Sequence, residues 1–337
     1  MKILEFTFLL IFISILNVQS QTKEDLKKKY ENSDLNSEID KKLRTNNIYP
    51  DSIILAPLHY TNSFYILDSI YSDLKSISMD ITIENEIPND YYFYISPFNF
   101  SINEIPIYCG MQTKGGGKSI KSKTNENIAF NGIFSRWFER THLALKTEGF
   151  YESSDHEGDF IGVRNYAYWN KGKYRLTLKK EDYVPGKSVK GIKNSNELYF
   201  SWGEYEHTWV TYTIENLETQ QISIIGSLAF PGKKLKLSNY ITSFTEQYGY
   251  YIDFAHKKRE NHYLHYKDIP YVKLTQSNLR INNEQIILKN VNTDHNRTHH
   301  PDQNKIPAKM PVLSTATYNS NTGELTIETG KFIEWSK

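Results

Sequence analysis

The sequence contains a single cysteine, Cys109, so no disulfide can form within this chain of 337 residues. Small secreted domains that lack a large core depend on such bridges. This chain must instead be held together by ordinary burial of apolar side chains, and its length is sufficient for that. We interpret Cys109 as a small buried apolar residue and not as a nucleophile.

The sequence also lacks an excess of charge of one sign, with 40 basic and 39 acidic residues and a net charge of +1. Proteins that bind nucleic acid electrostatically need a basic face, so nucleic acid is not an expected partner. Neither a dinucleotide-binding nor a phosphate-loop glycine pattern occurs, and the run Gly115-Gly116-Gly117 has the spacing of neither. A Gly-x-Ser-x-Gly motif is absent as well.

Long hydrophobic runs are absent except at residues 6–16, which follow Lys2 and precede Val18-Gln19-Ser20. A positive start, a short apolar stretch and a small residue at the cut are the parts of a signal peptide. We predict a signal peptide over residues 1–20 and a protein secreted to the periplasm or the extracellular space, with no membrane span after cleavage. An uncleaved anchor is the alternative, although the run is shorter than the roughly 18–20 residues that span a bilayer.

The rest of the chain divides by composition into three parts. Residues 21–50 are dense in charge and poor in apolar anchors, which predicts a charged linker. Residues 51–255 alternate apolar and polar positions between Asn, Asp, Gly and Pro, and residues 256–337 predict a small C-terminal β-extension. The expected strands are 52–60, 76–83, 90–98, 105–113, 128–137, 141–150, 160–168, 172–181, 196–202, 208–216, 221–229, 238–253, 271–274, 285–288, 315–319 and 325–335.

Frequent short strands with little helical periodicity predict an all-β fold, an antiparallel β-sandwich. The order of motifs between residues 76 and 250 resembles a secreted bacterial family, domain of unknown function 3472. The motifs are Ile107-Tyr108-Cys109-Gly110-Met111-Gln112-Thr113, Asn131-Gly132-Ile133-Phe134-Ser135-Arg136-Trp137, Glu157-Gly158 with Gly162, Tyr166-Ala167-Tyr168-Trp169, Gly172-Lys173-Tyr174-Arg175-Leu176 and Ile225-Gly226-Ser227-Leu228-Ala229-Phe230-Pro231.

The resemblance covers about half of the chain and implies a lectin-like jelly-roll sandwich without an established activity. The chain departs from the family pattern in a polar insert at residues 115–127 and in Asp155-His156, which stand where the family has glycines.

The densest polar cluster has three open interpretations. Its members are Glu148, Glu152, Asp155, His156, Glu157, Asp159 and Arg164. Two carboxyls that face one glycosidic bond would allow hydrolysis, with Glu148 and Glu157 as candidates here and Glu204 in a second cluster. Alternatively, the oxygens of Asp155, Glu157 and Asp159 are candidate Ca²⁺ ligands. A solvated acidic loop without a function is the third interpretation, and no other cofactor is expected.

Aromatic residues make up 14% of the chain, including 25 Tyr and 5 Trp. Tyr and Trp favour strands and also suit surfaces that bind flat amphipathic ligands such as sugars. On alternating positions Tyr166 and Tyr168 face one side and Trp169 the other. The candidate ligand-binding residues are Tyr166, Tyr168, Trp169, Trp202 and Trp209. If these side chains are buried, they are core residues instead.

Three functions remain open. The first is non-catalytic binding of an extracellular glycan, favoured by the predicted export and the aromatic β-fold. The second is a polysaccharide-degrading enzyme, a glycoside hydrolase or lyase with paired carboxylates. The third is a structural or adhesive protein that contacts another component of the cell envelope. Two glycosylation sequons, Asn99-Phe100-Ser101 and Asn296-Arg297-Thr298, are relevant only in a eukaryotic source.

Overall fold

The computed structural model describes residues 52–54, 59–89, 91–154, 158–188, 203–250, 263–265, 270–298 and 312–332. Within these ranges the chain forms β-strands, turns and one 3₁₀ helix, η1 (His142–Ala144), and no α-helix. None of the described segments is a helix long and apolar enough to cross a membrane. The prediction of an all-β, antiparallel sandwich is confirmed.

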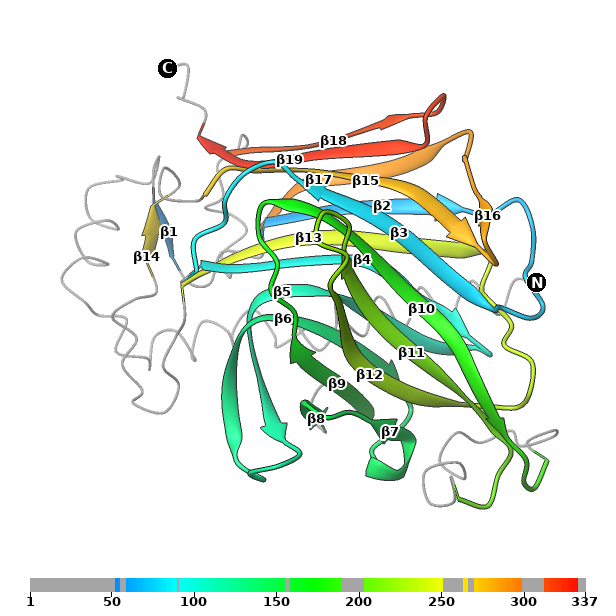
Figure 1. Cartoon of the computed structure of the whole chain (residues 1–337). Helices are drawn as coiled ribbons and strands as arrows, with labels where there is room; N and C mark the ends of the chain where they lie inside the picture. Colours follow the sequence, from blue (N-terminus) through cyan, green and yellow to red (C-terminus); the bar gives the residue numbers. More distant parts are fainter. Residues whose placement is uncertain are drawn as a thin grey trace, which may run out of the picture.

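One large sheet has eight strands, all paired antiparallel (Figure 1). Its order across the sheet is β17 (Val291–Thr298), β2 (His59–Ile66), β13 (Tyr240–Tyr250), β4 (Tyr91–Ile102), β5 (Ile105–Ser119), β6 (Asn125–Trp137), β9 (Phe160–Tyr166) and β8 (Phe150–Ser154). We refer to this as the eight-stranded sheet.

The other large sheet has nine strands and packs against the first. Its order is β18 (Val312–Asn319), β19 (Glu324–Phe332), β15 (Val272–Ile281), β3 (Ser76–Ile83), β10 (Gly172–Val184), β11 (His207–Asn216), β12 (Ile222–Pro231) and β7 (Leu145–Lys146), with β16 (Glu284–Gln285) beside β15. A separate pair joins β1 (Ser52–Ile54) to β14 (Tyr263–His265).

Strands from the C-terminal part of the chain belong to both large sheets. In the nine-stranded sheet β15 lies between β19 and β3, and in the eight-stranded sheet β17 pairs with β2. The strands predicted as a C-terminal extension are therefore additional strands of the two sheets of the sandwich itself (Figure 1).

The period-2 pattern explains why these segments are strands. In β3 the side chains of Ile77, Met79, Ile81 and Ile83 are all at most 1% exposed, while the residues between them are half-buried. Alternate residues of a strand face opposite sides of the sheet, so the apolar set points into the core between the sheets. The strand predicted at residues 76–83 has these same bounds in the structure.

The prediction of a strand at residues 141–150 is wrong for most of that segment. Thr141 caps η1 and its side chain accepts the N–H of Leu143, while the Glu139 carboxylate accepts the N–H groups of Arg140 and Thr141. Side-chain acceptors that take backbone N–H groups in this way compete with sheet pairing. Within this segment only the two residues of β7, which pair with β12, and Phe150, which begins β8, are in strands. The strand predicted at 196–202 lies outside the described residues.

Candidate functional site

The hairpin of β5 and β6 rises from the eight-stranded sheet and folds back onto its edge. Beyond their regular pairing, Lys118 and Ser119 of β5 also pair with Tyr151 and Phe150 of β8. Since β8 pairs with β9 and β9 with β6, the strands β5, β6, β9 and β8 form a closed ring. We call the raised part, residues 114–127, the arch.

Glycine residues allow the arch to approach the sheet. A Cβ atom on Gly115 would lie 2.6 Å from Nη1 of Arg164, and one on Gly117 would lie 2.9 Å from Cβ of Phe150. Contacts under 3.0 Å require a shift of one of the partners, so a side chain at Gly117 would push the arch away from β8, and one at Gly115 would displace the Arg164 guanidinium or the arch. The glycine run that has no phosphate-loop spacing therefore has a structural role in closing the ring.

Polar and aromatic side chains form rows across the outer face of the eight-stranded sheet, the face away from the core. Tyr94 pairs with Gln112, Gln112 with Asn131 and Asn131 with Tyr166, on four neighbouring strands. Four positions along, a second row consists of Tyr108, Ser135, Gly162 and Glu152. The register thus brings together polar residues that lie up to 72 positions apart, from Tyr94 to Tyr166.

Arg164 stands between these rows and binds residues from both. Its Nη2 donates to both carboxylate oxygens of Glu152, at 3.0 and 3.1 Å, and its Nη1 donates to Oδ1 of Asn131 at 3.1 Å and to Oε1 of Gln112. The Arg164 side chain is 8% exposed and that of Glu152 is 22% exposed. A buried ion pair with additional hydrogen bonds fixes the orientation of all four side chains.

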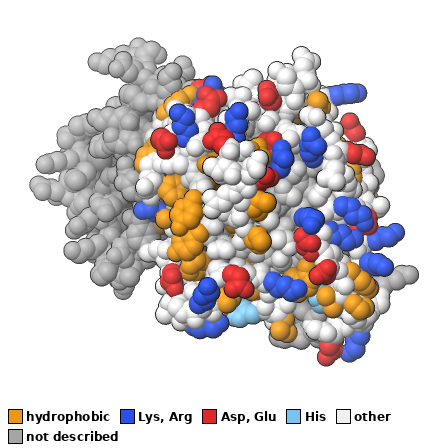
Figure 2. Space-filling view, viewed as in Figure 1, with side chains coloured by type: hydrophobic (Ala, Val, Ile, Leu, Met, Phe, Trp, Pro, Cys, Tyr) orange, Lys and Arg blue, Asp and Glu red, His pale blue; other side chains and the backbone are white. Residues whose placement is uncertain are grey.

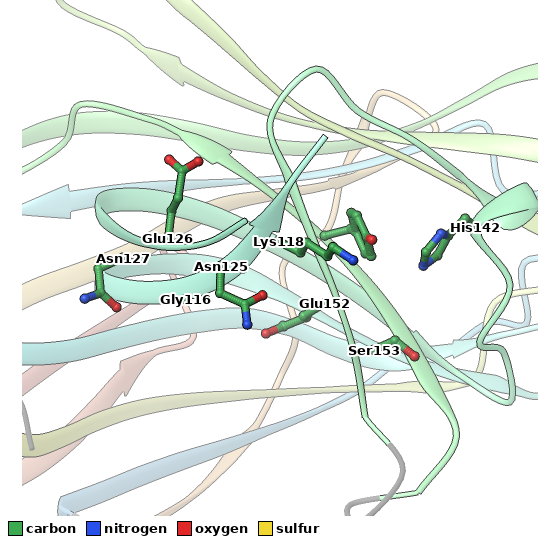
Figure 3. A pocket seen from close by; sticks show the side chains of 10 residues that line it. Gly116, Lys118, Asn125, Glu126, Asn127, His142, Glu152 and Ser153 are labelled. Carbon is green, nitrogen blue, oxygen red and sulfur yellow. The ribbon is translucent and has the colours of Figure 1, made fainter. Parts of the chain in front are cut away.

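A pocket of about 630 Å³ opens where the arch meets β8 (Figure 3). Its lining residues are Gly116, Gly117, Lys118, Asn125, Glu126, Asn127, His142, Tyr151, Glu152 and Ser153. Figure 3 shows Lys118, Asn125 and Glu152 in the middle of the pocket, with His142 toward one end and Glu126 and Asn127 toward the other. The short helix η1 supplies His142, which is why the capped turn at residues 139–144 matters for this site.

The aromatic and basic groups at one end of the pocket influence each other. The rings of His142 and Tyr151 meet edge to face with centroids 4.3 Å apart. Partial burial lowers the pKa of His142, and the positive charges of Lys118 and Lys123 lower it further. A neutral imidazole is therefore favoured at pH 7, and Lys118 is the cation that lines the pocket.

Two of the candidate ligand-binding residues form an exposed aromatic pair. Tyr166 is 42% exposed and Tyr168 is 77% exposed, and their rings are stacked at 6.5 Å between centroids with an interplanar angle of 11°. The ring of Phe150, which is buried, meets Tyr166 edge-on at 5.5 Å. We call Tyr166 and Tyr168 the tyrosine pair; they are the candidate residues that the structure places together at the surface.

The predicted ligand-binding tryptophans are not exposed. Trp169 is 3% exposed, its Nε1 donates to the carbonyl of Asn131 at 3.3 Å, and its ring packs on Phe130. Trp209 is 7% exposed and the Nζ of Lys146 lies 4.0 Å from its ring centroid. Both are core residues and cannot serve as open platforms, which corrects that part of the prediction. Trp202 lies outside the described residues.

The carboxylates predicted as catalytic are dispersed where the structure describes them. Glu148 is exposed in the bend before β8, and Glu204 is exposed and paired with Lys187 at 2.7 Å. Glu157 lies outside the described residues. Paired catalytic carboxyls must face one bond, about 5–10 Å apart, and no contact within the described ranges brings Glu148 to Glu204. The hydrolase or lyase interpretation stays a prediction.

The calcium prediction depends on residues that are mostly outside the described ranges. Asp155 and Glu157 are among those, and Asp159 forms an ion pair with Arg140. Among the residues that the structure describes, no group of three or more His, Cys, Asp or Glu side chains is arranged to hold a metal ion. Bound calcium stays a prediction.

Sequence reasoning overlooked most of the pocket. Lys118, Asn125 and Asn127 lie in the polar insert, which had no expected strand, and His142 lies in a segment predicted as a strand. Gln112 and Asn131 belong to motifs of the family resemblance, but they were not singled out as site residues. A polar amide in the middle of an otherwise apolar strand is the signal that points to them, because such a group needs a partner when it is buried.

Charges on the described part of the face shown in Figure 2 are of both signs and interspersed, with groups of hydrophobic side chains between them. Exposed large hydrophobic side chains besides the tyrosine pair include Ile222 and Ile224 on β12. The amide of Asn165 donates to the carbonyl of Ile224 at 2.9 Å, so these residues lie close to the end of β9.

No family model matches this chain, and no curated protein matches its sequence. Among solved structures, scytalido-glutamic peptidase with a peptide-based transition state analogue is similar at a TM-score of 0.35 and 8% identity, over 82% of this chain and 98% of the peptidase. SCP-B, a member of the eqolisin family of peptidases in complex with the tripeptide Ala-Ile-His, is similar at a TM-score of 0.30 and 9% identity, with the same coverage. Similarity this low carries no inference about the chemistry of the chain.

Proposed function

We propose that this protein is a secreted, non-catalytic glycan-binding protein in which the tyrosine pair stacks against sugar rings. The observation that carries the proposal is the parallel arrangement of two exposed tyrosine rings, 6.5 Å apart with an interplanar angle of 11°. Exposed tyrosine presents a flat apolar face and a polar hydroxyl, which matches the apolar face and hydroxyl rim of a pyranose. The apolar leader at residues 6–16 supports export.

The support beneath the tyrosine pair favours a preorganised surface. Tyr166 ends β9 directly beside Asn131 of β6, and the buried ring of Phe150 packs against it from β8. Platform residues that are fixed before a ligand arrives lose little conformational entropy on binding. Tyr168 is more exposed than Tyr166, so it offers the larger contact area.

Hydrogen-bonding groups lie on the strands next to the platform. The pocket under the arch is lined by the side-chain amides of Asn125 and Asn127, on β6, and by the hydroxyl of Ser153, on β8. Both strands pair with β9, the strand that ends at Tyr166. Ligand sites commonly combine apolar or aromatic surface with a few positioned polar groups that determine specificity. A glycan that stacks on the tyrosine pair has such groups within the same part of the sheet.

The test is a binding and turnover screen of the secreted chain against a panel of polysaccharides by affinity electrophoresis, followed by calorimetry on those that bind. We expect binding without the release of new reducing ends. Tyr168→Ala should weaken binding at least about 10-fold, equivalent to about 1.4 kcal/mol. Because Tyr168 is 77% exposed, the variant should unfold at the wild-type temperature.

The matched control is Ile70→Ala, which removes another exposed apolar side chain, 65% exposed, from the connection between β2 and β3. This variant should bind as the wild type does. The proposal would be overturned if no polysaccharide bound, or if Tyr168→Ala bound with wild-type affinity. Release of reducing ends would replace it with an enzymatic function.

A further inference from the structure

Several exposed polar side chains that line the pocket under the arch have no partner among the residues that the structure describes. Within the described part of the chain, no hydrogen bond engages the side chains of Asn125, Asn127 or Ser153, and no ion pair engages Lys118. Each of these groups can donate a hydrogen bond. Four donors that face one pocket of about 630 Å³ suit a ligand rich in acceptor oxygens.

The two carboxylates of the pocket, in contrast, already accept hydrogen bonds from other side chains of the protein. Both oxygens of Glu152 accept from Nη2 of Arg164, at 3.0 and 3.1 Å. Oε1 of Glu126 accepts from Oγ of Ser122 at 2.6 Å and from Oγ1 of Thr124 at 3.3 Å. Their charges are compensated or stabilised by groups of the protein itself.

Lys118 is therefore the uncommitted charge in the pocket. It lies in the middle of the lining, beside Asn125 and Glu152 (Figure 3). A second lysine, Lys123, is close enough to act on His142 together with Lys118. Opposite charge supplied by a ligand would be favourable here, because the nearest carboxylates are held by Arg164 and by hydroxyl groups.

The pocket and the tyrosine pair are linked through the same strands. Phe150 contacts Tyr166 and precedes Tyr151, which lines the pocket, and its own backbone pairs with Ser119 of the arch. Consecutive residues of β8 thus connect the two features. A ligand that contacts both features has to extend along β8, and a sugar chain is an extended ligand of this kind.

We infer that the pocket receives an anionic group of the bound sugar chain, a carboxylate or a sulfate, which Lys118 and the amides of Asn125 and Asn127 hold while the tyrosine pair stacks on a neighbouring ring. This inference rests on the proposed glycan binding and defines its ligand class as acidic polysaccharides.

The test compares matched acidic and neutral polysaccharides: polygalacturonate and its methyl ester, glucuronoxylan and xylan, and dextran sulfate and dextran. Affinities of the secreted chain are measured by affinity electrophoresis at about 20 and 200 mM salt, since salt screens exposed charges. We expect at least one acidic member to bind 10-fold or more tightly than its neutral partner at low salt. The preference should shrink at high salt.

Lys118→Gln should reduce that preference to about 2-fold or less, while Tyr168→Ala should weaken acidic and neutral members alike. The matched control is Lys114→Gln, a lysine of the same arch that does not line the pocket, and it should keep the preference. Equal binding of acidic and neutral members would overturn the inference and leave the proposed function intact. An unchanged preference in Lys118→Gln would overturn the assignment to this pocket. Failure of every polysaccharide to bind would contradict the proposed function itself.

Discussion

A buried carboxyl next to the pocket is expected to make the stability of the protein depend on pH. Glu139 is 0% exposed, and its Oε1 accepts the N–H groups of Arg140 and Thr141 at 2.8 and 2.7 Å. Its Oε2 has no hydrogen-bond partner in the described structure. Burial raises the pKa of Glu139 to about 7, although the charge of Arg136 and the two backbone N–H groups oppose the shift.

The size and sign of the effect follow from the difference between the folded and unfolded states. An ordinary Glu has a pKa of 4.5, so the unfolded chain releases this proton at a lower pH than the folded chain does. The stability that the neutral carboxyl provides is complete below pH 4.5 and is lost as the pH rises through about 7. At about 1.4 kcal/mol per pKa unit, the loss amounts to roughly 3 kcal/mol above pH 7.

Glu139→Gln removes the titration and keeps an oxygen that accepts the two backbone N–H groups. We expect the variant and the wild type to have similar stability at pH 5. At pH 8 the variant should be more stable, by up to roughly 3 kcal/mol, which for a chain of this size is a rise of about 6 °C in melting temperature. Scanning calorimetry at pH 5, 6, 7 and 8 measures this difference.

Glu148→Gln is the matched control, because it makes the same substitution at an exposed side chain. A Glu139→Gln variant that is less stable than the wild type at pH 8 would refute the reasoning. That result would mean that attraction to Arg136 keeps the carboxylate ionised and outweighs the cost of burial.

Three further predictions concern the ring of strands and its surroundings. Gly110→Ala should destabilise the protein by about 1–3 kcal/mol in urea unfolding, because a Cβ there overlaps backbone atoms of β4. The control Gly116→Ala, whose Cβ meets nothing closer than 3.8 Å, should cost under about 0.5 kcal/mol, and equal costs would contradict the prediction. Glu152→Gln should cost about 3 kcal/mol by leaving Arg164 buried without its counter-charge, and a wild-type unfolding midpoint would show that the pair is unimportant. Asn99 should carry no glycan after secretion from eukaryotic cells, since its Nδ2 donates to two backbone carbonyls inside the sheet; glycopeptide mass spectrometry that finds an occupied Asn99 would disprove this.

The alternation of apolar and polar side chains predicted the strand bounds best where one face of the strand is apolar and the other is polar. The segment Ser76–Ile83 has apolar residues at every second position, and its bounds were predicted correctly. The hairpin of β5 and β6 was predicted too short because its tip is polar on both faces and rich in glycine. In the structure β5 continues to Ser119 and β6 begins at Asn125. Backbone pairing extends over these residues, although their side chains show no apolar and polar alternation.

For the candidate site, composition identified residue types but could not assign exposure. Tyr168 and Trp169 are neighbours in the chain, yet Tyr168 is 77% exposed and Trp169 is 3% exposed. The alternation predicted that they face opposite sides, but it could not show which side is covered by the other sheet. The pocket escaped prediction for a different reason: Lys118 meets Tyr151 only because the arch folds back, a contact between residues 33 positions apart.

The same close approach connects the fold to both parts of the proposed site. Gly115 and Gly117 let the arch descend onto Arg164 and Phe150. Ser119 and Lys118 of the arch pair with Phe150 and Tyr151 of β8, and the ring of Phe150 contacts Tyr166. Substituting either glycine by a larger residue should therefore disturb the pocket and the tyrosine pair together, whereas Lys118→Gln and Tyr168→Ala disturb them one at a time. If one ligand contacts both features, substituting either glycine should reduce the binding free energy for an acidic polysaccharide. This reduction should be at least as large as the sum of the reductions in Lys118→Gln and Tyr168→Ala.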